Sequence, residues 1–183
     1  PDLGQCIEDA CRDRRVLEQQ RRASAAGGDD GLFGQCAAAI DEPHLARLGL
    51  TNYWGYNPVA FFVPDPRLAP GGIAELRDCA QALHAAGIEL LLDVVFNHTG
   101  EGDALGPTLS LRGLDNATYY RTVAGDGARY IDDAGCGNTL ALERAGPMRL
   151  ALDALRYYAV VAGVDGFRFD LATTLARRGQ VFD

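Results

Sequence analysis

Apolar residues in the middle of the chain form a short continuous run at residues 59–63 and a nearly continuous one at residues 88–95, broken by Glu89 and Asp93, with a periodic stretch between them. Continuous runs of this length are typical of buried strands, and above all of parallel strands that are covered on both faces. Between the runs, apolar residues recur every three or four positions over residues 72–86, which predicts an amphipathic helix that ends at Gly87. Residues 59–95 are therefore predicted to form a strand, a helix and a second strand.

The alternation of helix and strand continues towards the end of the chain. A helix is predicted over residues 147–162, with Pro147 at its first position, where the missing N–H of proline does no harm. A strand is predicted over residues 165–169, and a long loop over residues 97–146 precedes the helix. A loop of that length is more typical of a functional segment than of a simple connection. The order strand, helix, strand, loop, helix, strand predicts an α/β fold with a parallel sheet.

The first forty residues differ from the rest of the chain. Residues 7–26 are rich in charged residues and glutamine and could form a helix, and residues 25–31 read as a linker. We therefore assign no domain to residues 1–40 and place the α/β domain at residues 41–183.

The composition is that of an ordinary globular protein, with 48% hydrophobic and 23% charged residues among 183. The net charge of −8, without a basic stripe, argues against nucleic acid and anionic membrane surfaces as partners. No apolar run is long enough to cross a bilayer and no signal peptide is visible, so a cytoplasmic location is expected. The five cysteines include no metal-site spacing, which favours reduced thiols and predicts no metal.

Candidate chemistry begins with the strand at residues 165–169, where Phe167 and Phe169 alternate with Arg168 and Asp170. The two-residue period sends the arginine and the aspartate to one face of the sheet. Burying such a pair costs several kcal/mol per ion, so stability alone is a weak reason for it. A carboxylate beside a guanidinium stays ionised at neutral pH, as a nucleophile must. A structural ion pair is the alternative.

Polar residues also stand near the ends of the two earlier strands. Asp93 interrupts an apolar strand and needs a partner inside the fold, while Asn97 and His98 follow where that strand ends. Residues 52–58 (NYWGYNP) combine aromatic rings with amides, which suits sugars, although the aromatic residues could equally belong to the core. Ligands bind at the carboxyl ends of strands in α/β folds, so these groups are expected to converge.

The segments DVVFNHT and GFRFDLA strongly resemble two signature regions of the α-amylase superfamily, family 13 of the glycoside hydrolases. The segments LTNYWGYNP and GCGNTL, and the run from PMRLALDAL to TTLARR, resemble the isoamylase and glycogen-debranching branch of that family. The resemblance covers about residues 41–178. It implies that residues 41–183 are a partial catalytic (β/α)8 TIM barrel, about strands two to four with their helices.

The resemblance also implies roles for six residues. Asp170 matches the catalytic nucleophile that forms a covalent glycosyl–enzyme intermediate, and Arg168 matches the arginine that orients it. In the same way His98 matches a residue that binds the glucose 6-hydroxyl, and Tyr56 one that stacks on that glucose.

Asp93 and Asn97 match residues that organise the site and bind substrate. Some relatives bind calcium near the asparagine, but the sequence shows no cage of oxygen ligands for calcium. No cofactor is expected.

Retaining hydrolysis needs a second carboxyl group as general acid, which the family carries on its fifth strand. That region, and a later His-Asp signature, do not occur in the 183 residues. We therefore expect the chain to be a fragment of a glycogen-debranching glycosidase that acts on α-1,6 branches of glycogen or branched maltodextrin. On its own it is expected to be inactive, with the missing half of the barrel in a downstream segment.

Three alternatives remain open at this stage. The chain could come from another α-glucan hydrolase of the family, such as an amylase or a trehalose-releasing enzyme. It could be a non-catalytic glucan-binding remnant of the barrel. It could also be a truncated or mis-framed product without a function of its own.

Overall fold

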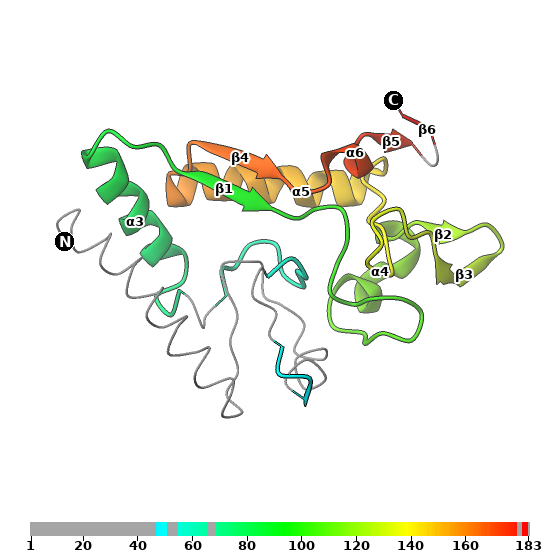
Figure 1. Cartoon of the computed structure of the whole chain (residues 1–183). Helices are drawn as coiled ribbons and strands as arrows, with labels where there is room; N and C mark the ends of the chain where they lie inside the picture. The colour runs from blue at the N-terminus through cyan, green and yellow to red at the C-terminus, as the bar shows by residue number, and fades with distance from the viewer. Residues whose placement is uncertain (1–46, 51–54, 66–68, 179–180, 183) are drawn as a thin grey trace.

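The computed structural model describes residues 47–50, 55–65, 69–178 and 181–182. Its elements, drawn in Figure 1, are α3 (Ile73–Ala85), β1 (Leu91–Val94), α4 (Leu111–Tyr119), β2 (Thr122–Val123), β3 (Asp126–Tyr130), α5 (Ala145–Tyr157), the π-helical turn η1 (Tyr158–Ala162), β4 (Gly166–Phe169), α6 (Ala172–Leu175), β5 (Arg177–Arg178) and β6 (Val181–Phe182).

The sheet that matters for function is the parallel pair β1 and β4, which lie side by side although 75 residues separate the paired positions. Their register places Asp93 opposite Arg168. Helix α3 precedes β1, and α5 with η1 precedes β4, so the chain alternates helix and strand as predicted. Both predicted helices are confirmed to within two residues, and the mixed α/β content is confirmed.

One face of the sheet packs on α5, which runs along it in Figure 1. The small residues Ala151 and Ala154 are buried there beside Val94 and Phe96, so the apolar side of the helix can approach the strand closely. A second cluster joins α3 to η1 and to the residue just after η1 and its cap, and its buried members are Leu76, Tyr158, Ala162 and Val164. These two clusters fix the positions of β1 and β4 relative to α3, α5 and η1.

The strand predicted at residues 59–63 is wrong, because the structure has no strand there. Pro58 and Pro64 bound the run, and proline cannot donate the N–H that a strand ladder needs. The run instead buries Phe61, whose ring stacks on Phe96 at a centroid distance of 5.6 Å. The apolar composition of residues 59–63 predicted the burial of Phe61 correctly, but it predicted the wrong secondary structure.

Two further predictions need correction. Pro147 is the third residue of α5 rather than the first, at a position whose N–H is equally without a helical partner. The segment 97–146 is a folded insert rather than a loop, since it holds α4 and the hairpin of β2 and β3. Figure 1 shows this insert beyond the carboxyl ends of β1 and β4.

The insert is held together by a buried carboxylate. Glu101 is 0% exposed and accepts backbone N–H bonds from Leu109, Ser110 and Arg112 at 2.7, 2.8 and 3.0 Å, as well as the hydroxyl of Tyr120. Burial alone would raise the pKa of Glu101, but the hydrogen bonds from Tyr120 and the backbone outweigh it, so the pKa lies below its ordinary value. The Glu101 carboxylate therefore accepts hydrogen bonds from N–H groups at the N-terminal end of α4, where a negative charge is favourable.

Arg112 completes this arrangement from the other side. Its guanidinium donates to the carbonyl oxygens of Gly106, Gly102 and Asp103 at 2.7, 3.0 and 2.7 Å. The loop 101–107 is thus wrapped around one arginine side chain. Where this loop closes, Gly106 lies so near the backbone carbonyl of Glu101 that a larger residue does not fit there.

Substitution of Gly106 by alanine is expected to destabilise the insert by about 1–3 kcal/mol, because the added Cβ would lie 1.9 Å from the carbonyl oxygen of Glu101. Gly127→Ala is the control, since a Cβ there meets nothing within 4 Å. Amide hydrogen exchange over residues 99–112 is expected to accelerate in Gly106→Ala only. Equal exchange in the two variants would contradict the close approach.

Some predictions lie outside the described residues: the whole of residues 1–40, the aromatic residues Tyr53 and Trp54 with Asn52, and the cysteines Cys6, Cys11 and Cys36. Within the described part of the chain, no helix has the length and apolar character to cross a membrane.

Candidate active site

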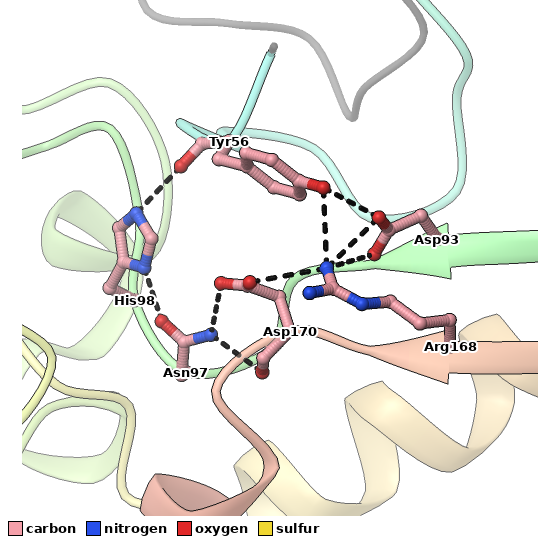
Figure 2. Close-up of polar contacts among 6 residues, drawn as sticks. All are labelled: Tyr56, Asp93, Asn97, His98, Arg168 and Asp170. Atoms are coloured by element: carbon pink, nitrogen blue, oxygen red, sulfur yellow. Dashed lines mark hydrogen bonds and ion pairs between the residues drawn. The ribbon is translucent and has the colours of Figure 1, made fainter.

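The register of β1 and β4 creates a polar patch where the two strands end. Asp93 and Arg168 are directly paired positions, and Asp170 follows the last paired residue of β4. The backbone N–H of Asp170 still donates to the carbonyl of Val94 at 3.0 Å, so its position is set by the sheet. Asn97 and His98 follow β1 at the same end. Figure 2 shows these residues and Tyr56 arranged as a ring.

Arg168 is the hub of one side of this ring. Its Nη1 atom lies 2.9 and 3.0 Å from the two carboxylate oxygens of Asp93, and 3.2 Å from Asp170 Oδ1. The same nitrogen donates to the hydroxyl of Tyr56 at 3.2 Å, and that hydroxyl donates to Asp93 at 2.6 Å. The hydrogen bond to Asp93 raises the pKa of Tyr56 above its ordinary value, so the phenol stays neutral.

Asn97 holds Asp170 from the other side. Its side-chain Nδ2 donates to the backbone carbonyl of Asp170 at 3.0 Å and to the carboxylate Oδ2 at 3.2 Å. One oxygen of the Asp170 carboxylate therefore faces Asn97 and the other faces Arg168. The carboxylate is fixed by two donors, Arg168 on β4 and Asn97 in the segment that follows β1.

His98 closes the ring between Asn97 and Tyr56. Its Nε2–H donates to the backbone carbonyl of Tyr56 at 2.7 Å, and its Nδ1 contacts the side-chain oxygen of Asn97. The residue is 1% exposed. Burial lowers the pKa of His98, while the Tyr56 carbonyl and the charges of Asp170 and Asp132 act in the opposite direction.

The chain turns sharply after Asp170. Leu171 has φ 44° and ψ 47°, and within the described residues it is the one non-glycine with a positive φ. That left-handed conformation costs about 1–2 kcal/mol, and strained residues of this kind cluster at functional sites. The turn ends β4 abruptly and starts α6, so the side chain of Asp170 stands at the open end of the sheet.

The ring faces solvent on the side of Arg168, whose side chain is 55% exposed. Exposed ion pairs contribute about 0–1 kcal/mol to stability, so this pairing does little to hold the fold together. It does hold the partly buried carboxylate of Asp170, whose side chain is 17% exposed, beside that solvent-facing guanidinium. Among the described residues, no group of three or more His, Cys, Asp or Glu side chains could hold a metal ion.

The structure brings together all six residues singled out in the sequence, namely Tyr56, Asp93, Asn97, His98, Arg168 and Asp170. Two residues that support the ring were not singled out. Thr99 and Asn138 lie directly behind His98 and bond to each other. Both stand in segments already quoted for the family resemblance, DVVFNHT and GCGNTL, which was the available signal.

Two comparisons with known proteins, one of sequences and one of solved structures, agree on a family. The chain is 54% identical over 144 residues to a "Glycogen debranching enzyme" of Yersinia enterocolitica, a match covering 75% of the chain and 21% of the relative. It is 48% identical over 143 residues to a "Glycogen operon protein GlgX homolog" of Mycobacterium bovis, covering 75% of the chain and 20% of the relative.

Among solved structures, the pullulanase of Paenibacillus barengoltzii in complex with maltohexaose and α-cyclodextrin superposes with a TM-score of 0.63 at 26% identity. That match covers 86% of this chain and 25% of the pullulanase. No protein-family model matches the chain.

The α/β fold, with an arginine, an aspartate, an asparagine and a histidine where two parallel strands end, is of the same class as the fold of that pullulanase. The chain belongs to the α-amylase superfamily, family 13 of the glycoside hydrolases. Its curated relatives lie in the glycogen-debranching branch of that family, and the chain spans about a fifth of their length.

Proposed function

We propose that the full-length protein containing this chain hydrolyses α-1,6 branch linkages of glycogen or a related α-glucan, with retention at the anomeric carbon. The observation that carries the proposal is the carboxylate of Asp170, held between Arg168 and Asn97 at the open end of the sheet. The names of the relatives support the substrate class, because they refer to glycogen debranching, and the pullulanase was solved with maltooligosaccharides.

In this mechanism an oxygen of Asp170 attacks the anomeric carbon of the glucose at the branch point. The bond from that carbon to the leaving 6-oxygen breaks, and the leaving oxygen takes a proton from a general acid. Water then attacks the glycosyl–Asp170 ester, the same acid now acting as base, and the carboxylate is regenerated. We assign the general acid to the remainder of the full-length protein.

The other five residues receive supporting roles. Arg168 and Asn97 orient the attacking carboxylate, since each donates to one of its oxygens. Tyr56 offers its ring as a face for the sugar, and Asp93 anchors both Tyr56 and Arg168. His98 is assigned to the 6-hydroxyl of the bound glucose.

The finer architecture belongs to the same proposal. Residues 41–183 would supply about strands two to four of a catalytic (β/α)8 barrel, with β1 and β4 as two of them. The fold of the pullulanase supports this arrangement. We place the protein in the cytoplasm, in keeping with relatives named for glycogen metabolism.

The test is the full-length protein assayed on glycogen and on linear amylose. Release of linear maltooligosaccharides from glycogen, without cleavage of amylose, is expected. Cleavage of amylose alone would assign the protein to the α-1,4-acting hydrolases of the family. Binding of maltooligosaccharide without any cleavage would make it a glucan-binding protein.

A further inference from the structure

Asn138 is fully buried, with 0% exposure. Its side-chain oxygen accepts the backbone N–H of Thr99 at 3.0 Å. Its side-chain nitrogen donates to the carbonyl oxygens of Thr99 at 3.0 Å and Gly102 at 2.8 Å. One amide side chain thus satisfies both backbone groups of the residue that follows His98.

Leu140, two residues after Asn138, bonds through its backbone to Asn97, the residue before His98. The N–H of Leu140 donates to the carbonyl of Asn97 at 2.9 Å. Because Asn97 and Thr99 are the two neighbours of His98, segment 138–140 fixes the main chain on both sides of the histidine. Asn97 in turn donates to Asp170, so the same contact also bears on the carboxylate.

The glycine before Asn138 explains how this segment comes so close. Gly137 has φ +93°, and a Cβ there would lie 2.6 Å from the backbone nitrogen of Asp103 and 2.9 Å from the carbonyl carbon of Gly102. Only glycine fits that conformation at that distance. The motif GCGNTL, which had no role in the ring itself, therefore supplies a close approach followed by an amide.

A second contact braces Thr99 from the insert. Its hydroxyl bonds to the hydroxyl of Tyr120 at 2.8 Å, and Tyr120 donates to the buried Glu101. Burial, together with the bond to Glu101, raises the pKa of Tyr120, so the phenol remains a donor. The turn that carries His98 is consequently held by side chains from two parts of the insert, and none of them reaches the open side of the ring.

We infer that Asn138 is a positioning residue for the active site: it holds the turn 97–99 so that His98 and Asn97 face the bound glucose and Asp170. This inference rests on the proposed function for the meaning of "active site", but its geometric part does not. Losing the amide frees the backbone of Thr99 and leaves buried polar groups without partners, so the turn relaxes. A shift of about 1 Å in catalytic groups can cost on the order of 10²-fold in rate.

The test uses Asn138→Asp in the full-length protein. This variant keeps an acceptor for the Thr99 N–H, loses the donor to two carbonyl oxygens and places a negative charge against them. On a branched glucan, kcat is expected to fall by about 10- to 100-fold, with KM changed little. Since burial raises the pKa of the new carboxyl, and its protonated form regains one donor, the ratio of variant to wild-type kcat is expected to rise as pH falls.

A substrate-free readout separates positioning from stability. The NMR titration of His98, assigned by its loss in His98→Gln, is expected to have its midpoint below the ordinary value in the wild type, because burial lowers the pKa. In the uncharged variant Asn138→Ser the midpoint is expected to move up towards the ordinary value as the ring becomes solvated. This variant decides the point, because the carboxylate of Asn138→Asp would raise the pKa of His98 by its charge alone. The groups that face His98, namely the Tyr56 carbonyl, Asp170 and Asp132, are unchanged in the variant.

Asn116→Asp is the matched control. Asn116 lies in the same insert but bonds to the carbonyl of Gly127 and to Tyr130 in the hairpin. It is expected to keep wild-type kcat and the wild-type His98 midpoint. If Asn138→Asp does not fold, Asn138→Ser removes the amide without adding charge and is judged by the same two measurements.

Wild-type kcat and an unmoved His98 midpoint in the Asn138 variant would overturn the inference. So would a loss of thermal stability without a shift of that midpoint, or equal losses in Asn116→Asp. If the unsubstituted protein cleaves no branched glucan, the proposed function fails, and the His98 titration still decides whether Asn138 holds the turn.

Discussion

Substitution of Asp170 by asparagine in the full-length protein is expected to reduce hydrolysis of branched glucan by about 10⁴-fold or more. An amide cannot form the covalent ester with the anomeric carbon, and no other carboxylate occupies the place between Arg168 and Asn97 in the described part of the chain. Folding should be little affected, since asparagine has the same shape and its oxygen can still accept from one of the two donors.

The measurement is the rate of reducing-end release from glycogen, with binding of maltooligosaccharide followed in parallel. The control is Asp153→Asn on α5, where the carboxylate bonds only to the exposed Arg149 and Arg156 among the interactions seen. It is expected to retain full activity. Turnover in Asp170→Asn within tenfold of wild type would remove Asp170 from the role of nucleophile.

Replacement of Arg168 by methionine is expected to lower kcat by about 10²–10³-fold, the loss typical of removing one donor to a reacting group. The methionine leaves Asp93 and Asp170 facing each other without a cation, and frees the hydroxyl of Tyr56 from one of its two partners. Arg168→Lys is expected to recover part of this loss. All four close contacts of the guanidinium use the single atom Nη1, whose place one ammonium nitrogen can take.

Arg149→Met provides the comparison, because this arginine on α5 is 81% exposed and pairs with Asp153. It should leave kcat unchanged. An Arg168→Lys variant no more active than Arg168→Met would show that the planar guanidinium, rather than the position of one charged nitrogen, is what the site requires.

The ring could be predicted from sequence because its residues sit at strand ends. Once residues 88–95 and 165–169 read as strands of one parallel sheet, the polar residues at their carboxyl ends were expected to share one edge, whereas the pairing of Asp93 with Arg168 comes from the register of the structure. The two-residue period gave the side chains their faces. The helices were equally accessible, since their apolar residues recur at helical spacing.

What escaped prediction depended on contacts between distant segments. Residues 59–63 look like a strand by composition, and only the prolines at both ends signal otherwise. The insert at 97–146 has short elements, and Glu101 and Arg112 stabilise it by bonding to backbone groups, which leaves no periodic pattern. Asn138 acts across 39 residues on Thr99, and an isolated asparagine after a glycine reads equally well as an ordinary turn.

The order of these contacts along the chain has a consequence during synthesis on the ribosome. Asp93 cannot pair with Arg168 until Arg168 has been synthesised, 75 residues later. At roughly 5–20 residues per second this takes about 4–15 s. Asn138 is made only 39 residues after Thr99, and Tyr120 only 21. The half of the ring that carries His98 can therefore be braced while β1 still lacks its partner strand. Asp170 then arrives last, at a nascent site whose other wall is already in place.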